Sequence, residues 1–583
     1  MNQTARTSNT TSRTAAQQLL ELASQVGVQY IFTNFGSDHP AFIEAFALIH
    51  DRGGKMPQII VCPHEMTALS AAHGYAMITR RPQLVLVHVD VGTQNLGCSI
   101  HNAARGRVPA IIIAGLSPVS TSGERTGSRN EFIHYTQDTP RQHEIVGQYM
   151  KWCYEVRAPE MIDAVLLRAM QLATTMPEGP VYITGAREVW EELVAPSQEQ
   201  AFHWPAARTA GLAPEALAEL YQALCTSKRP LVISTYMGRQ PAAVQRLVAL
   251  SDRIGLGVCE VSPQYVNFPG DHPHHLGYRR NTLIDEADLI LMIDVDVPWI
   301  MSKVQPAADA KLFHIDADAV KQGLGFWHFP ALRSYLADSL QVLDQLLAID
   351  GAAAGEGRAA RHDWIVAAKQ RAMSPVNPPA EGPITAQQLT AAVRELVNER
   401  TIVVFEEPSA TELIPSVLQL KRPGSYFASG GSGLGWGVNA AIGAKLADPQ
   451  AEVIALIGDG CYLFGVPGSA YWVSGTYRVP FLTIIYNNGG WHAPKLSTTW
   501  VHPEGASSKN DTYWVTIGAG ARLADLAKAT GGADAFRVTE LSSLKDTLQQ
   551  AMQLVREGRS VVVDVTIAPI SGQVLKLTAP VAS

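Results

Sequence analysis

The stretch from Gly458 to Pro494 constrains the fold more strongly than any other part of this chain. An apolar run, EVIALI, precedes it, and it opens with the tight turn GDG. An amphipathic segment, a second apolar run (VPFLTIIY) and the polar turn NNGG follow. This alternation of strand, helix and strand is typical of a parallel βαβ unit. We therefore expect an α/β domain with polar residues at the ends of two parallel strands.

The polar residues at those strand ends suit a divalent cation and a phosphate. In open α/β sheets, ligands bind beyond the carboxyl ends of the strands, where Asp459 and Asn488 are expected. A carboxylate, an amide oxygen and a backbone carbonyl form an oxygen-only set suited to Mg²⁺. The glycines Gly458 and Gly460 would let the backbone and the next helix approach a phosphate. The alternative is a strand-end turn followed by an unrelated Asn-Gly turn.

Length and composition limit the classes of protein to which this chain can belong. A chain of 583 residues is too long for one core and predicts about three domains. The net charge of -7 does not support nucleic-acid binding, and no apolar run is long enough to span a membrane. Six cysteines without CxxC spacing fit reduced thiols in a cytoplasmic protein. Residues 1–13 are expected to form a disordered tail, with a transit-peptide fragment as the alternative.

In order and spacing, GDG and NN resemble the signature of thiamine diphosphate enzymes, the group of acetolactate synthase, benzoylformate decarboxylase, benzaldehyde lyase and pyruvate decarboxylase. The resemblance implies that Asp459, the Asn488 side chain and the Gly490 carbonyl hold Mg²⁺. It also implies an α/β fold of three doubly wound parallel-sheet domains. These would be a pyrimidine-binding domain over 14–192, a central domain over 205–350 and a diphosphate-binding domain over 380–570, followed by a tail over 571–583.

Glu65 is the acid expected to activate the cofactor. It lies where the strand QIIV runs into a helix, in the stretch HEMTA, which resembles the family's strand-to-helix HE motif. Thiamine reacts after it loses the proton at C2, and a carboxyl bound to the pyrimidine ring promotes that loss. The alternative for Glu65 is a helix-dipole partner or a member of a capping box.

Further cofactor contacts follow from the resemblance. Gly92 and Thr93 are expected in a Gly-rich turn at the end of a strand, close to the pyrimidine; a simple turn is the alternative. Leu434 matches the bulky residue that holds the cofactor bent in relatives, although it could be a core leucine. The full set of expected cofactor contacts is Gly92, Thr93, Asn95, Gly433, Leu434, Gly458, Gly460, Cys461, Asn488 and Trp491.

Other polar residues are candidates for proton transfer. Asp38 and His39 lie side by side in the turn after the first strand, where relatives carry an acid or a histidine. Asp38 could instead, or in addition, cap the helix that begins near Pro40. His134 and Gln137 are alternatives in one polar loop, and His492 either supplies a proton or faces a subunit contact.

The central region reads as a doubly wound domain with a helix-like segment over 283–287. Its histidines His272, His274 and His275 suggest a metal site, but no cysteine or carboxylate has ligand spacing, so a structural loop is favoured. No GxGxxG motif supports FAD or another nucleotide.

The cofactor implies chemistry next to a carbonyl group. We expect a decarboxylase or carboligase acting on 2-oxo acids, in the manner of acetolactate synthase. A simple pyruvate decarboxylase is less favoured, because Pro494 stands near the position where those enzymes have a glutamate. The alternatives are a lyase acting on 2-hydroxy ketones or 2-hydroxyacyl thioesters and a non-catalytic subunit. The resemblance also implies a homodimer or homotetramer whose active sites lie at the subunit interface.

Overall fold

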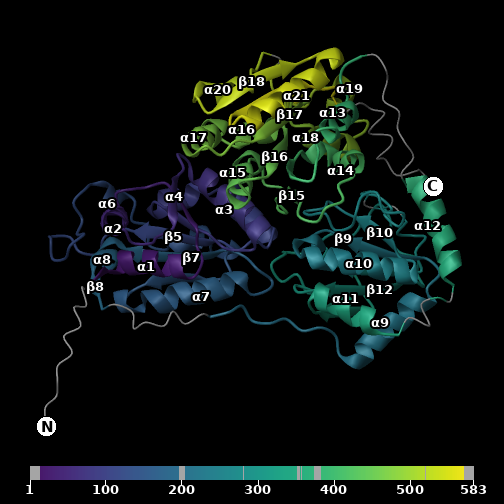
Figure 1. Cartoon of the computed structure of the whole chain (residues 1–583), viewed down its shortest axis with the longest axis horizontal. Coiled ribbons are helices and arrows are strands. Elements are labelled where there is room, and N and C mark those ends of the chain that lie inside the picture. Colours follow the sequence, from purple (N-terminus) through teal and green to yellow (C-terminus); the bar gives the residue numbers. More distant parts are fainter. Residues whose placement is uncertain are drawn as a thin grey trace, which may run out of the picture. The chain divides into compact units, whose positions relative to one another are not determined.

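The computed structural model describes residues 13–195, 204–279, 281, 283–350, 355, 357–372, 382–518 and 520–569. They form two compact units that divide near residue 207 (Figure 1). Of the expected tails over 1–13 and 571–583, all but Arg13 lie outside the described residues, and Arg13 belongs to the first strand. The three domain boundaries stay predictions. Within the described ranges, no helix combines the length and apolar character needed to cross a bilayer.

The first unit is built on a six-stranded parallel sheet in the order β3-β2-β4-β5-β7-β6. Helices α1, α2, α7 and α8 pack on one face through a shared apolar core, and a short antiparallel pair, β1 and β8, joins the ends of the unit. The strands are β1 (Arg13–Thr14), β2 (Tyr30–Thr33), β3 (Gln58–Val61), β4 (Leu84–Val87), β5 (Ile111–Leu116), β6 (Cys153–Val156), β7 (Val181–Ala186) and β8 (Leu193–Val194). The helices are α1 (Ala15–Gln25), α2 (Pro40–Asp51), α3 (Glu65–Thr79), α4 (Val89–Asn95), α5 (Cys98–Arg105), α6 (Ile133–Thr136), α7 (Ile162–Thr174) and α8 (Arg187–Glu191).

Capping residues or a proline mark the N-termini of three of these helices. Thr14 and Gln17 form a reciprocal capping box at α1, and Pro40 occupies the first position of α2, where its missing N–H costs nothing. His64 caps α3 by accepting the N–H of Met66, so the cap does not occupy the Glu65 carboxylate.

The second unit begins with the central domain, a five-stranded parallel sheet in the order β10-β9-β11-β12-β13. The segment 283–287, expected to be helix-like, consists of turns, and Leu283 has a positive φ of 65°, which ends any helix there. The strands are β9 (Pro230–Ser234), β10 (Gly257–Glu260), β11 (Leu289–Ile293), β12 (Lys311–Asp316) and β13 (Arg333–Leu336). The helices are α9 (Pro214–Thr226), α10 (Pro241–Ile254), α11 (Ser339–Ala348) and α12 (Arg358–Ala372).

The rest of the second unit is a six-stranded parallel sheet in the order β15-β14-β16-β17-β19-β18. The strands are β14 (Thr401–Glu406), β15 (Tyr426–Ala428), β16 (Glu452–Gly458), β17 (Leu482–Asn487), β18 (Ala533–Val538) and β19 (Ser560–Thr566). The helices are α13 (Ala386–Arg394), α14 (Leu413–Leu418), α15 (Gly437–Ala447), α16 (Asp459–Phe464), α17 (Pro467–Tyr477), α18 (His492–Val501), α19 (Ala506–Asn510), α20 (Asp525–Ala529) and α21 (Leu541–Arg556).

Both six-stranded sheets have the same strand order when their strands are numbered along the chain, namely 2-1-3-4-6-5. The first and last domains are therefore two versions of one architecture, as expected from the sequence. In each sheet, the residues that follow the central strands lie at the carboxyl edge, where doubly wound sheets bind ligands.

Candidate active site

The carboxylate of Glu65 is buried and held from two sides in the first unit. The side chain is 4% exposed. The Asn34 side chain donates to Oε1 and the Asn95 side chain donates to Oε2, both at 3.1 Å. A Cβ added at Gly92 would lie 3.2 Å from Oε1, so a larger residue there would crowd the carboxylate. The fold thus brings the expected residues Glu65, Gly92 and Asn95 together and adds Asn34, a polar residue directly after a buried strand that the sequence analysis overlooked.

The expected Gly-rich turn at Gly92 and Thr93 is wrong in its local structure. Strand β4 ends at Val87, and the residues that follow form helix α4 instead of a turn. The Thr93 hydroxyl donates to the carbonyl of Val89 at 2.6 Å and contacts the Tyr182 hydroxyl at 2.8 Å. The Thr93 side chain is therefore already bonded inside the domain, whereas Gly92 faces Glu65.

The buried Asp38 and the half-buried His88 form a polar pair next to Gln137. One carboxylate oxygen of Asp38 bonds Nδ1 of His88, the other accepts the Val89 N–H at 3.2 Å, and His88 Nε2 lies 2.9 Å from Oε1 of Gln137. Burial acts against ionisation of both groups, but the neighbouring His39 and His88 lower the pKa of Asp38, and the bond and charge of Asp38 raise the pKa of His88. Both ring nitrogens of His88 thus face oxygens, which favours a protonated ring.

The expected cap at α2 is not made by Asp38. His39 occupies the capping position without a side-chain bond to the helix. Instead, Asp38 fits against the sheet because Gly115 leaves room: a Cβ at Gly115 would lie 1.8 Å from the Asp38 carboxylate. His88 was also missed by the sequence analysis, although a histidine directly after the apolar strand LVLV was a usable signal.

The other two histidine candidates of the first unit differ in their surroundings. His39 is fully buried, and its Nδ1 accepts the Gly36 N–H at 2.9 Å. Burial lowers its pKa, although the charge of Asp38 opposes this. His134 Nε2 lies 3.2 Å from the Ser37 hydroxyl, and burial, followed by the charge of Arg187, lowers the pKa of His134.

In the second unit, the metal-ligand candidates meet at the ends of neighbouring strands. Oδ1 of Asp459 accepts the Gly460 N–H at 2.6 Å, and Oδ2 accepts those of Gly489 and Gly490 at 2.8 and 2.9 Å. Oδ1 of Asn488 accepts the Gly490 N–H at 3.3 Å. Burial raises the pKa of Asp459 to about 6. The backbone around the two glycines thus fixes one carboxylate and one amide oxygen in the same small region.

Two acids at the end of β14 were missed by the sequence analysis. Glu406 accepts three N–H groups at the start of α15, from Gly435, Trp436 and Gly437. Glu407 follows it, next to the strand that carries Asp459. Burial raises the pKa of both glutamates to about 7. The sequence signal was the pair of acids after the apolar run TIVVF.

The other expected cofactor contacts surround this region. Gly433 and the half-buried Leu434 lie in the segment before α15, so Leu434 is not a fully enclosed core residue. A Cβ at Gly460 would lie 2.3 Å from Nε1 of Trp491, so this glycine accommodates an indole. Cys461 is buried in the first turn of α16.

His492 begins α18 directly after the glycine turn. The side chain is buried, and its Nδ1 has no hydrogen-bond partner among the described residues. Burial, then the charge of Lys495, lowers its pKa. The ring is therefore kept neutral.

The donor set of the second unit fits Mg²⁺ and a diphosphate. Oε2 of Glu407 and Nε1 of Trp491 are buried and lack hydrogen-bond partners among the described residues. Asp459 is a buried carboxylate whose raised pKa would fall beside a cation. Asp459, Asn488 and the Gly490 carbonyl are oxygen donors of the kind that Mg²⁺ prefers.

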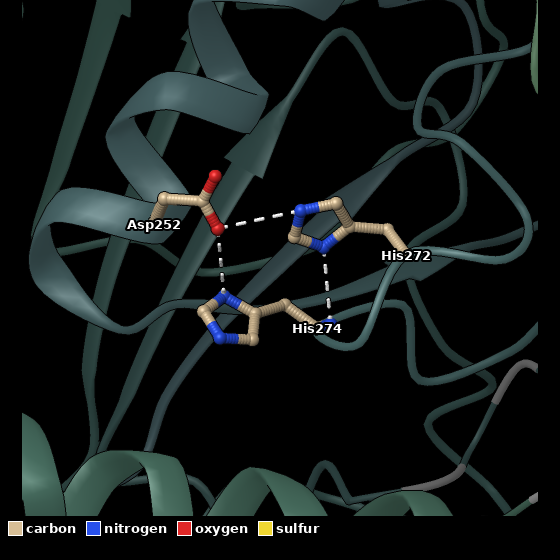
Figure 2. Close-up of side chains that lie close together, drawn as sticks. All are labelled: Asp252, His272 and His274. Carbon is tan, nitrogen blue, oxygen red and sulfur yellow. Dashed lines mark hydrogen bonds and ion pairs between the residues drawn. The ribbon is translucent and has the colours of Figure 1, made fainter.

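The central domain contains a separate cluster, shown in Figure 2. One carboxylate oxygen of Asp252 lies 3.3 Å from Nε2 of His272 and 4.0 Å from Nδ1 of His274. The sequence analysis found no carboxylate partner for these histidines, and the fold supplies one from α10. The fold therefore corrects the expectation that no carboxylate is available to these histidines.

The hydrogen bonds of this cluster favour an ion-pair group over a metal site. Nδ1 of His272 accepts the His274 N–H at 3.1 Å, so the proton of a neutral His272 ring is on Nε2, facing Asp252. The Ser251 hydroxyl donates to Leu256 O and therefore accepts from His274 Nδ1. Both nitrogens that face Asp252 thus carry protons, whereas a metal ligand must offer a lone pair.

Comparisons with known proteins agree with this architecture. Three family models match: "Thiamine pyrophosphate enzyme, N-terminal TPP binding domain" over residues 13–145, the central domain over 217–346 and the C-terminal TPP binding domain over 411–565. Benzoylformate decarboxylase of Pseudomonas aeruginosa is 26% identical over 81% of this chain and 85% of its own length. The acetolactate synthase large subunit of Lactococcus lactis is 26% identical over 81% of this chain and 80% of its own.

A solved structure shows the same fold. The crystal structure of benzoylformate decarboxylase from Polynucleobacter necessarius superposes with a TM-score of 0.77 at 21% identity, covering 96% of this chain and 100% of that chain. The three family models match residues in all three sheets, with the central sheet matched along its whole length. This chain therefore belongs to the thiamine pyrophosphate enzyme family.

Proposed function

We propose that the protein is a thiamine diphosphate- and Mg²⁺-dependent enzyme that releases CO₂ from a 2-oxo acid and then protonates the resulting carbanion or transfers it to a second carbonyl. The observation that carries this proposal is the Glu65 carboxylate fixed by Asn34 and Asn95. A protein that only binds the cofactor has no need of a carboxylate placed to activate it. The relatives named benzoylformate decarboxylase and acetolactate synthase support the 2-oxo acid class.

The candidate residues of the two units would have different tasks. The bound cofactor supplies a thiazolium that holds the electrons of a carbanion next to a carbonyl. Asp459, Asn488 and Gly490 would hold Mg²⁺ with the diphosphate. Glu65 would bind the pyrimidine ring and exchange a proton with it. His88, whose pKa is raised by Asp38 against the effect of burial and whose Nε2 faces Gln137, is the residue in the first unit best suited to donate a proton to the substrate.

The decisive experiment is a product analysis on the purified protein. It would be supplied with thiamine diphosphate and Mg²⁺ and offered aliphatic and aromatic 2-oxo acids, with and without an aldehyde acceptor. CO₂ release with formation of an aldehyde or a hydroxy ketone is the expected result. No CO₂ from any 2-oxo acid would overturn the proposal and favour a lyase acting on 2-hydroxy ketones or 2-hydroxyacyl thioesters.

The same proposal includes a homodimer or homotetramer in the cytoplasm. The described residues contain six free cysteines, in agreement with a reducing compartment. Light scattering after size-exclusion chromatography should give a mass of two or four chains. A monomer that turns over substrate at full rate would contradict the expected oligomer.

A further inference from the structure

Glu406 is a buried acid that binds the start of a helix. It is the last residue of β14 and is 7% exposed. Oε1 accepts the Gly435 N–H at 2.7 Å and the Trp436 N–H at 3.2 Å, and Oε2 accepts the Gly437 N–H at 2.7 Å. The N–H groups at the start of a helix lack partners inside the helix, and the helix dipole favours a carboxylate there. One side chain of the sheet thus fixes the position at which α15 begins.

The carbonyl of Gly435 is held as well. The Asn439 side chain donates to the Gly435 carbonyl and to the Gly465 carbonyl, both at 2.8 Å. Gly435 has a positive φ of 96°, and a Cβ added there would lie 2.6 Å from the carbonyl oxygen of Phe464, so a larger residue does not fit. Both polar groups of the Gly435 backbone are therefore fixed by side chains, one from β14 and one from α15.

Leu434 directly precedes this fixed glycine. It is half-buried, and it is the residue expected from the family resemblance to hold the cofactor bent. The N–H that Gly435 donates to Glu406 belongs to the peptide group that joins Leu434 to Gly435. Because a peptide group is planar, the carboxylate fixes the plane to which the Cα of Leu434 is attached. The placement of the Leu434 side chain therefore depends on Glu406.

We propose that Glu406 is a positioning residue that sets where Leu434 stands against the cofactor, by holding the Leu434–Gly435 peptide group and the start of α15. This inference rests on the proposed function, which it deepens by naming the group that determines the position of the cofactor-bending side chain. Glu406 binds three backbone N–H groups, and in this role it acts through Leu434 without touching the substrate.

The test is a double-mutant cycle of Glu406→Gln, Leu434→Ala and the variant with both changes. The glutamine amide has a single oxygen, so its NH₂ group faces at least one of the three N–H donors and weakens the hold on α15. The assays are run at pH 8, because burial raises the pKa of Glu406 to about 7 and the carboxylate must be ionised. The measured quantity is the rate of hydrogen–deuterium exchange at C2 of bound thiamine diphosphate.

We expect C2 exchange to slow by about 10- to 100-fold in each single variant, since a small misplacement of a positioning group has effects of this size. The double variant should be at most about threefold slower than the slower single variant, because both changes remove the same contact with the cofactor. In Glu406→Gln, kcat should fall with the rate of C2 exchange, while KM for the 2-oxo acid should change less than about threefold.

A second measurement needs no cofactor. In the cofactor-free Glu406→Gln protein, the backbone amides of residues 435–437 should exchange their hydrogens faster than in the wild type, because they have lost a fixed acceptor. Unchanged exchange at these amides would show that the carboxylate does not hold the start of α15, which would overturn the inference.

Glu452→Gln is the matched control. Glu452 is also buried, at 5% exposed, and binds the side chains of Asn398, Arg400 and Arg556. It begins β16, so it lies at the edge of the same sheet opposite to Glu406. Its loss should lower the free energy of unfolding and leave C2 exchange unchanged. Equally slow exchange in this variant would trace the effect to general destabilisation and contradict the inference.

Losses that multiply in the double variant would show that Glu406 and Leu434 act independently and would overturn the inference, as would wild-type C2 exchange in either single variant. If Glu406→Gln does not fold, Glu406→Asp takes its place in the cycle, with the same two outcomes, because its carboxylate stands one methylene group farther from α15. Failure of the proposed function looks different. The wild-type protein would then release no CO₂ from any 2-oxo acid, whereas C2 exchange could still be measured.

Discussion

Asp38 and His88 are 50 residues apart in the chain and form a part-buried pair at the carboxyl edge of the first sheet. Asp38 stands in the turn after β2, and His88 follows β4, the neighbouring strand. Because parallel neighbours end at the same edge, the fold places an acid beside an imidazole that is far from it in the chain. The bond and the charge of Asp38 raise the pKa of His88, so the protonation of His88 depends on Asp38.

Replacing Asp38 by Asn should move the alkaline limb of the kcat/KM profile to lower pH. Burial lowers the pKa of His88, but the bond and the charge of Asp38 raise it. Without the Asp38 charge, the His88 ring therefore loses its proton at lower pH. Turnover should fall by about 10- to 100-fold at pH 8. Asp90→Asn is the control, since Asp90 is the weakest of the causes acting on His88. An unmoved limb would exclude His88 as the titrating donor.

Gly115→Ala should disturb the same pair by steric means. The added Cβ would lie 1.8 Å from the Asp38 carboxylate, so Asp38 must leave its position. We expect a loss of about 1–3 kcal/mol in the free energy of unfolding, together with the pH shift of Asp38→Asn. Gly147→Ala serves as control because nothing lies within 4 Å of its added Cβ. Equal behaviour of the two alanine variants would contradict the geometry around Asp38.

Glu65→Gln should keep cofactor binding and lose turnover by about 10²- to 10⁴-fold. The amide replaces the carboxylate between Asn34 and Asn95 without changing its volume, but it cannot exchange the proton. Cofactor binding can be followed by fluorescence quenching, and C2 activation by hydrogen–deuterium exchange. Turnover close to that of the wild type would refute the assigned role of Glu65.

Metal-dependent cofactor binding should weaken as the pH falls through about 6. The pKa of Asp459 is raised to about 6 by burial, and a metal ligand must be ionised, so protons compete with Mg²⁺ below that value. Retention of thiamine diphosphate in dialysis at pH 5 and pH 7.5 measures this. Asp459→Ala should abolish metal-dependent binding at both values. Unchanged affinity in that variant would show that the metal lies elsewhere.

Glu407→Gln should stabilise the cofactor-free protein at pH 8 and have little effect at pH 5. Burial raises the pKa of Glu407 to about 7, so the folded state favours the protonated carboxyl group. As the pH rises through about 7 this group must ionise while buried, and the free energy of unfolding falls. A neutral amide avoids that loss, which amounts to at most about 3 kcal/mol. Thermal unfolding at both pH values checks the sign; a destabilised variant at pH 8 would contradict it.

Short-range patterns in the sequence predicted much of this protein. The α/β class followed from apolar runs that end in polar turns. The family was expected from the resemblance of GDG and NN to its signature, and the comparisons confirm it. Asp459 and Asn488 could be proposed because they end neighbouring strands of one βαβ unit. Glu65 could be proposed because its motif spans a single strand–helix junction. In each case the informative residues are close together in the chain.

Tertiary structure alone decided the partners that come from distant strands and loops. Asn34 reaches Glu65, His88 reaches Asp38, and Arg187 reaches Ser37 only after strand pairing has set the order of the sheet. The same holds for the Asp252 carboxylate beside His272, a contact that the spacing of residues in the sequence did not predict. Local sequence determines where a strand ends and which side chain stands there. Which strand ends become neighbours depends on the packing of the whole domain, and that packing brought the charged groups of the candidate site together.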